Sequence, residues 1–112
     1  MGEQNKNLID LLFQCAMSCN QCAVACLDEH DVKNLTRCIK LDMDCSEICR
    51  LTANLLSRDS ARAELLLTTC AEICYACAEE CDRHAKMGME HCRKCAETCR
   101  KCADACESGV AA

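Results

Sequence analysis

The sequence contains no proline and no tryptophan, and its only glycines are Gly2, Gly88 and Gly109. Proline and glycine weaken helices more than any other residues, so their scarcity favours helix along nearly the whole chain. Phe13 and Tyr75 are the only aromatic side chains of the Phe, Trp and Tyr type. The chain therefore lacks platforms for base stacking, and its core has to be filled by aliphatic side chains, methionine and cysteine.

A run of charge of one sign is also missing. The net charge is −5, with 13 basic and 18 acidic residues interspersed, which leaves no basic patch for nucleic acid or anionic lipid. The polar start of the chain is followed by a short apolar run, residues 8–13, which Asp10 interrupts. This pattern predicts no signal peptide, no twin-arginine signal and no membrane span, and hence a cytoplasmic protein.

What the sequence does contain is cysteine, at sixteen of its 112 positions. In a reducing cytosol this density indicates metal binding more than disulfides, and the length suits one domain over residues 1–112. Three sets of cysteines repeat steps of four, three and four residues, and a further set has Asp42 at the place of its second cysteine. The sets are Cys15, Cys19, Cys22 and Cys26; Cys38, Cys45 and Cys49; Cys70, Cys74, Cys77 and Cys81; and Cys95, Cys99, Cys102 and Cys106, with Cys92 preceding the last.

The repeated spacing places each set on one face of a helix. At about 100° per residue, steps of four, three and four keep the side chains within a stripe about 60° wide. The stripes predict helices over residues 7–28, 32–56, 60–86 and 89–107. Asp31 and residues 57–60 offer N-caps, and Gly88 suits a left-handed turn. Short connections then predict an all-α, antiparallel up-down-up-down four-helix bundle with a cysteine-lined core.

The same spacing indicates which metal the thiols prefer. Cysteines four apart on a helix lie about 6 Å apart and lean the same way, so a pair can hold one ion from two sides, as Cu(I) prefers. Structural zinc sites use four tetrahedral ligands, and a few of them would leave most thiols unused. Iron–sulfur clusters are typically held by loop cysteines, and disulfides along one helix would be strained. The column predicts multiple Cu(I) ions, on the order of a dozen or more per chain.

An antiparallel bundle of these helices has two unlike ends. At one end leucines extend the cysteine stripes and seal the core, namely Leu8, Leu11, Leu12, Leu56, Leu66 and Leu67. The other end brings together weaker Cu(I) donors, namely His30, His84, His91, Met87 and Met89. Imidazole and thioether suit ions that are received and passed inward, so we interpret this end as the entrance. The alternative is that histidine is common near helix ends, where its cation favours the C-terminal dipole.

Asp42 interrupts the cysteine pattern. A carboxylate is a poor ligand for Cu(I) and is costly to bury unpaired. Three arrangements are open: a hydrogen bond to a thiol, an ion pair with Lys or Arg, and rotation to the helix edge. A structural or tuning role is favoured over ligation.

A second apolar line runs along helix 7–28, on the face away from its cysteines. Its members are Ile9, Phe13, Met17 and Val24. Single apolar side chains on a surface are normal, but recurrence at helical spacing also predicts an interface between copies of the chain.

The densest motifs of the chain carry a family resemblance. They are Cys45-Ser-Glu-Ile-Cys49, Cys70-Ala-Glu-Ile-Cys74-Tyr-Ala-Cys77-Ala-Glu-Glu-Cys81 with His84, and Cys92-Arg-Lys-Cys95-Ala-Glu-Thr-Cys99-Arg-Lys-Cys102-Ala-Asp-Ala-Cys106. They resemble the bacterial copper storage proteins in their cytosolic form. The resemblance implies storage of Cu(I) by core cysteines, a His-bearing entrance and a homotetramer of bundles, with a copper chaperone or copper enzyme as a candidate partner. Asp42 at a cysteine place and the additional Cys92 depart from the family pattern.

Three alternatives use the same residues differently. A zinc or general heavy-metal buffer of metallothionein type would employ the same thiols. Cysteine could also fill the core as a small hydrophobe, although leucine, isoleucine or alanine would do so without risk of oxidation. An enzyme is not predicted: thiol oxidoreductases use one exposed Cys-x-x-Cys at a helix start, and a di-iron oxidase needs Glu-x-x-His motifs. The residues three before His84 and His91 are Cys81 and Gly88.

Overall fold

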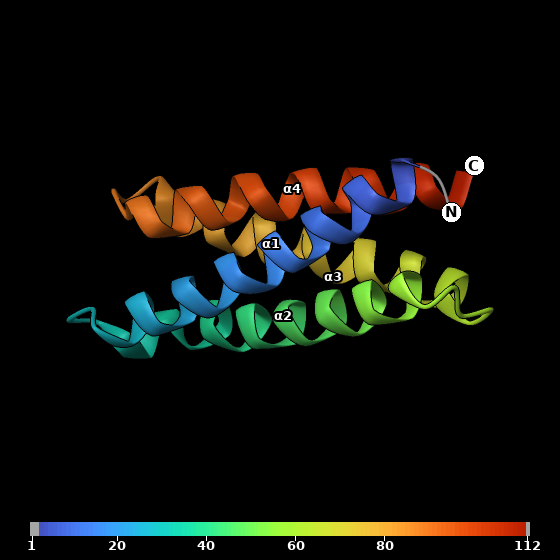
Figure 1. The fold of residues 1–112 in the computed structure, drawn as a ribbon. Helices are drawn as coiled ribbons and strands as arrows, with labels where there is room; N and C mark the ends of the chain where they lie inside the picture. The colour runs from blue at the N-terminus through green and yellow to red at the C-terminus, as the bar shows by residue number, and fades with distance from the viewer. Residues whose placement is uncertain (1–2, 112) are drawn as a thin grey trace.

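The computed structural model describes residues 3–111. They form four α-helices and one short 3-10 helix, joined by short connections. The elements are α1 (Glu3–Leu27), η1 (Val32–Leu35), α2 (Thr36–Ser57), α3 (Ala63–Ala85) and α4 (Glu90–Ala111). The helices run alternately in opposite directions (Figure 1). The connection between α2 and α3 lies at one end of the bundle, and the other two connections lie at the opposite end. The predicted antiparallel up-down-up-down four-helix bundle is confirmed.

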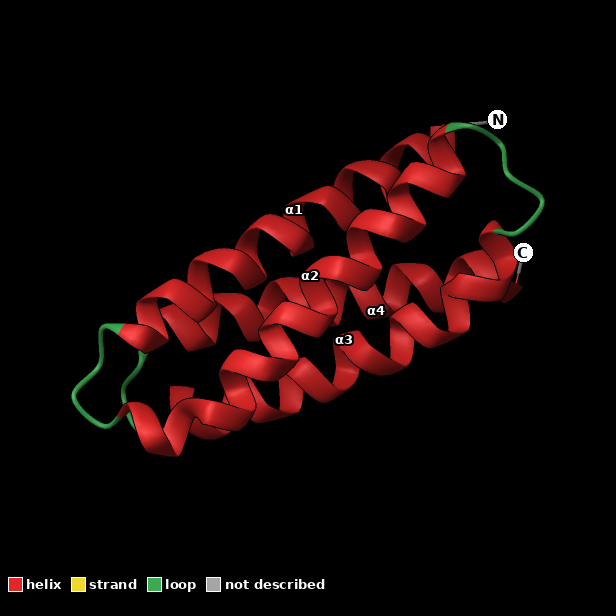
Figure 2. Ribbon diagram, turned by 90° about the horizontal axis from the view of Figure 1, so that it is seen from below, coloured by secondary structure: helices red, strands yellow, loops and turns green. Residues whose placement is uncertain are grey.

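Each helix packs along two neighbours. α1 and α3 both contact α2 and α4, so the helices occupy the corners of a square in chain order. The bundle measures 45 × 19 × 18 Å, and Figure 2 shows the helices side by side along its length. The narrow cross-section follows from the small side chains of its core, which are mainly cysteine and alanine. The cysteine-bearing faces of all four helices can therefore meet along one axis.

Two helix starts differ from the sequence prediction. The first residues of the predicted 32–56 helix form the 3-10 turn η1, and the Asp31 carboxylate accepts a hydrogen bond from the Asn34 side chain instead of capping the helix. The third helix begins at Ala63 and not at residue 60. Ser60 lies in the preceding turn, where its hydroxyl accepts a hydrogen bond of 3.1 Å from the Arg62 backbone N–H. In both places local side-chain bonds compete with the first turn of the helix.

The left-handed turn predicted at Gly88 is confirmed. Gly88 has a φ of 94°, its N–H bonds to the Ala85 carbonyl at 2.9 Å, and the Met89 N–H bonds to the His84 carbonyl at 3.3 Å. These two bonds form a Schellman motif, which satisfies carbonyl groups at the end of α3. The turn therefore fixes the backbone of the residue that carries the His84 imidazole.

The leucine end is closed by an apolar layer. Leu8, Leu12, Leu56 and Leu67 are buried there, whereas Leu11 and Leu66 are only partly buried. α4 passes close to this layer at Gly109, where an added Cβ would meet Leu8 and Leu67 side-chain carbons at 3.4 Å. The predicted seal is present, with four of the six leucines in its buried part.

Helix α1 bears on the prediction that no stretch of the chain spans a membrane. The segment Asn5–Leu27 of α1 is long enough and apolar enough to cross a membrane. Much of its apolar character comes from cysteine and alanine, which hydropathy scales count as apolar. In the bundle the four cysteines of this helix face the core and are 0 to 2% exposed. Packing between helices accounts for the apolar character of this face.

Candidate metal centre

All sixteen cysteines lie in the core. Their exposure is between 0 and 2%, and within residues 3–111 every one of them is a free thiol. Each helix contributes its stripe because steps of three and four residues return to the same helical face. The predicted column of sulfur is therefore present along the axis of the bundle.

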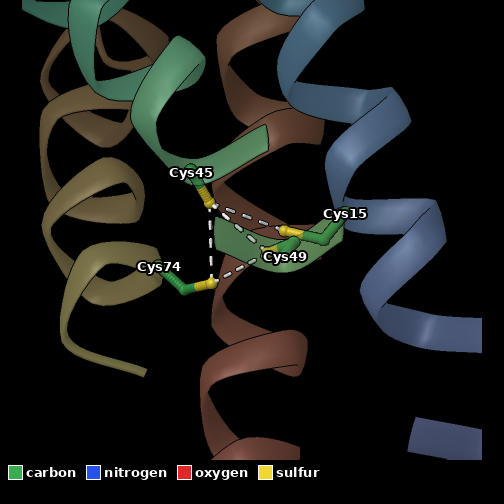
Figure 3. Close-up of side chains that lie close together, drawn as sticks. All are labelled: Cys15, Cys45, Cys49 and Cys74. Carbon is green, nitrogen blue, oxygen red and sulfur yellow. Dashed lines mark hydrogen bonds between the residues drawn. The ribbon is translucent and has the colours of Figure 1, made fainter. Parts of the chain in front are cut away.

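The middle of the column contains overlapping groups of thiols from different helices. The Cys45 and Cys49 sulfur atoms both lie 3.5 Å from the Cys74 sulfur, and Cys15 completes a group whose four sulfurs are within 4.8 Å of one another (Figure 3). Two further groups share members with it or with each other, namely Cys15, Cys19, Cys45 and Cys99, and Cys19, Cys77, Cys95 and Cys99. Shared members mean that one sulfur can bridge two ions, as polynuclear thiolate clusters require.

The thiols of the metal-free core are difficult to ionise together. Hydrogen bonds to neighbouring thiols, together with burial, raise the pKa of Cys19, Cys49 and Cys106 above that of a free cysteine. Each buried thiolate would lose its hydration and repel the next one a few ångströms away. A metal cation removes both costs when it replaces the protons. Metal binding to this core is therefore coupled to proton release.

Asp42 lies fully buried among the thiols. Its Oδ1 is 3.1 Å from the Cys77 sulfur and 3.4 Å from the Cys95 sulfur. The Cys81 and Cys38 sulfurs lie 3.8 and 3.9 Å from its two carboxyl oxygens. Of the three arrangements left open by the sequence, the hydrogen bond to thiols is the one present. Burial, followed by the nearby Cys95 and Cys38, raises the pKa of the Asp42 carboxyl to about 9, so this group is neutral at pH 7.

At the end of the bundle where the sequence predicts an entrance, His91 lies beside three thiols. Its Nε2 is 3.6 Å from the Cys26 sulfur, and the Cys92 sulfur is 4.0 Å from both the Cys22 and Cys26 sulfurs. The four donor atoms lie within 4.8 Å of one another. The other ring nitrogen, Nδ1, faces a carboxylate oxygen of Glu29 at 3.8 Å. We call Cys22, Cys26, Cys92 and His91 the entrance group.

His84 is buried in a different setting. Its Nε2 lies 2.9 Å from Glu80 Oε2, and both residues are at most 5% exposed. Arg83 and Arg37 approach the other oxygen of Glu80 at 2.9 and 3.3 Å. The two arginines thus compensate the charge of the buried Glu80 side chain. If His84 donates a hydrogen bond to Glu80 through Nε2, its other ring nitrogen, Nδ1, carries the lone pair. Glu80 was not predicted, because the Glu-x-x-His pattern covers only the residue three before a histidine, whereas residues four apart also share a helix face.

The remaining predicted entrance residues lie further from the thiols. His30 is exposed in the connection after α1, and Met87 is 68% exposed. Met89 is partly buried and packs against the core. The structure therefore brings His91 to the thiols and His84 to a buried carboxylate, while His30 and Met87 stand at the surface.

The pKa of Asp42 leads to a prediction for the metal-free protein. Because the folded pKa of about 9 exceeds the ordinary value of 3.8, the native state binds one proton more than the unfolded state between these pH values. The free energy of unfolding then falls as pH rises through this window. We expect Asp42→Asn to stabilise the reduced protein in urea denaturation, by up to about 4 kcal/mol at pH 7 and by less at pH 5. Asp44→Asn, an exposed change on the same helix, is the control, and an equal effect at both pH values would contradict the assignment.

The sequence and the fold of this chain are similar to those of known copper storage proteins. The model of the copper storage protein family matches residues 1–111. A cytosolic copper storage protein of Streptomyces lividans, solved with five coppers, superposes with a TM-score of 0.94 at 45% identity over 98% of this chain and 94% of that one. The same protein loaded with 10 copper equivalents gives 0.93 at 45% identity, over 97% of this chain and 85% of that one.

A solved structure and a curated sequence from Bacillus subtilis are also similar. The Cu(I)-bound copper storage protein BsCsp3 superposes with a TM-score of 0.88 at 35% identity, over 95% of this chain and 97% of that one. The cysteine-rich protein YhjQ of strain 168 is 35% identical over 76 residues, which are 68% of this chain and 70% of that protein. The family match over nearly the whole length, together with the buried column of thiols, shows that this chain belongs to the copper storage protein family.

Proposed function

We propose that this protein stores Cu(I) in the cytosol, working as one bundle whose core cysteines are the ligands. The observation that carries the proposal is the set of overlapping groups of four buried thiols. A monovalent ion for each thiolate leaves the core close to neutral, whereas unpaired thiolates at this depth would be costly. Sixteen thiols then support a capacity on the order of a dozen or more ions. The related Streptomyces lividans protein is described as cytosolic, which supports the compartment.

Entry of copper is proposed at the end that carries His84 and His91. His91 lies within reach of Cys26 and is 24% exposed, so it can accept an ion from outside and pass it to a thiol. The leucine layer blocks the opposite end. A copper chaperone or a copper enzyme would exchange ions at the open end, where His30 and Met87 are exposed and Met89 is partly buried.

A zinc buffer of metallothionein type is not favoured. Tetrahedral zinc needs four ligands per ion, but the four-thiol groups of the core share Cys15, Cys45, Cys19 and Cys99. Zinc ions at these groups would have to share sulfurs, and four thiolates around each divalent ion would leave net negative charge in a buried position. An enzymatic role is not proposed, because the thiols are enclosed.

The capacity of the core can be measured directly. Anaerobic titration of the reduced protein with Cu(I), against a competing chelator, should give tight binding up to a dozen or more ions, with about one proton released per ion because the thiols start protonated. Pre-incubation with an equal amount of Zn²⁺ should leave this capacity unchanged. Saturation after a few ions, or equal competition by zinc, would refute copper storage.

The histidines should affect the rate of copper uptake more than the number of copper ions that the protein binds. Replacing His30, His84 and His91 together by Ala should slow copper uptake from a chelated donor at least several-fold, because the first ligands at the open end are removed. The sixteen thiols remain, so the final number of ions bound should fall by no more than the few that imidazole holds. Stopped-flow absorbance gives the rates and equilibrium titration gives the capacity. A loss of half the capacity would instead make these residues storage ligands.

We also propose a homotetramer of bundles, on the exposed apolar line of α1. Phe13, Met17 and Val24 are 40, 56 and 61% exposed, and contact between copies would remove them from water. Sedimentation velocity should therefore detect a tetramer, and Met17→Glu should shift it to smaller species. Leu65→Glu, at an exposed leucine of α3, is the matched control and should leave the assembly intact. A monomeric wild-type protein would rule out this interface.

A further inference from the structure

The entrance group differs from the core groups in the type of its donors. Cys22, Cys26 and Cys92 offer sulfur, and His91 offers Nε2 as a fourth ligand. Three thiolates and one imidazole are a common donor set of structural zinc sites. Two-coordinate Cu(I) makes no use of a fourth donor. The composition of the group therefore indicates a four-coordinate divalent ion.

Three of the six donor-to-donor distances are close to those of a tetrahedral zinc site, and the other three are at most 4.8 Å. With Zn–S near 2.3 Å and Zn–N near 2.0 Å, a tetrahedral zinc ion requires S–S edges of about 3.8 Å and S–N edges of about 3.5 Å. The Cys92 sulfur lies 4.0 Å from the Cys22 and Cys26 sulfurs, and the Cys26 sulfur lies 3.6 Å from His91 Nε2. These edges need to change by only a few tenths of an ångström on binding.

A carboxylate stands behind the imidazole. Glu29 Oε2 faces His91 Nδ1 at 3.8 Å, on the side away from the thiols. In zinc sites the ligating histidine usually gives its second N–H to a carboxylate, a carbonyl or water, which orients the ring and strengthens the metal-bound nitrogen. Glu29 lies in the connection after α1, and His91 is in the first turn of α4. Their approach therefore arises from the fold.

Charge and access favour the entrance group over the four-thiol groups of the core. Four thiolates around a divalent ion leave two negative charges at a site that is fully buried. Three thiolates and a neutral imidazole leave one, and His91 is 24% exposed to water, which reduces the cost of that charge. A hydrated divalent ion also reaches this group before any other thiols.

We propose that the entrance group binds one Zn²⁺ per chain and that Cu(I) displaces it. Displacement is a ligand exchange in which Zn–S and Zn–N bonds break, Cu–S bonds form and the hydrated Zn²⁺ leaves, with no change of oxidation state. Thiolates prefer the softer Cu(I), so the exchange runs toward copper. The site goes beyond copper storage, because its occupation requires no copper, and it depends on Cys92, which the regular cysteine sets do not contain.

Cobalt tests the coordination directly. Reduced, metal-free full-length protein titrated anaerobically with Co²⁺ should develop the intense d–d absorption of tetrahedral cobalt, with thiolate-to-cobalt charge transfer, saturating at one ion per chain. One equivalent of Zn²⁺ should remove the signal. Cys92→Ser and His91→Ala should each weaken cobalt binding more than tenfold, and Glu29→Gln, which leaves all four ligands, about tenfold. Cys106→Ser, at the closed end, is the matched control: it removes one storage thiol and should leave cobalt binding unchanged.

The outcomes separate this site from the storage function. A tetrahedral signal that survives both Cys92→Ser and His91→Ala would place the ion elsewhere and overturn the proposal. So would octahedral cobalt alone, or several ions binding with equal affinity. The Cu(I) capacity of the same samples is measured in parallel. A low capacity with an intact cobalt site would refute storage alone, and the reverse would refute the zinc site alone. Far-ultraviolet circular dichroism verifies that each variant is folded. Glu29→Gln, at a partly buried side chain outside the thiol core, provides a test that does not alter the core.

Discussion

Close contact between thiols is the constraint on which the whole structure depends. Sulfur atoms from different helices approach to between 3.5 and 4.0 Å along the axis, and this requires every helix to turn a narrow cysteine stripe inward along most of its length. Small neighbours such as Ala78 and Ala103, both fully buried, let the helices come close enough for these contacts. Buried leucines lie toward the two ends of this column, with Leu8, Leu12, Leu56 and Leu67 at one end and Leu35 at the other.

The same constraint creates an electrostatic problem, and the structure solves it by keeping the metal-free core neutral. Burial opposes ionisation of the thiols, and burial is also the main reason why Asp42 is held in its protonated form. Glu80 is the exception. It is a buried carboxylate placed at the edge of the bundle, where Arg37 and Arg83 can reach it from the surface. A carboxylate without such partners would be tolerated in this core only as the acid.

The two ends of the bundle carry different side chains. The leucine layer lies at one end and the histidines at the other. Leucine side chains close one end, and Gly109 allows α4 to pass over them without a clash. At the other end the Schellman turn at Gly88 ends α3 just after His84 and starts α4 just before His91. Two imidazoles thus lie at this end of the bundle, one beside Glu80 and the other beside Glu29.

The sequence alone was sufficient for the helices, their alternating direction, the inward cysteine stripes, the leucine seal and the turn at Gly88. Each of these follows from the period of a helix or from the conformational preference of one residue, and such properties are local. The neutral setting of Asp42, the burial of Glu80 beside His84 and the approach of Glu29 to His91 were decided only by the tertiary structure. So were the particular thiols that meet, such as Cys15 with Cys45, Cys49 and Cys74. These contacts either join different helices or depend on how far a helix is rotated about its own axis. The rotation and axial shift of each helix set them, and these two quantities are determined only when all four helices pack together.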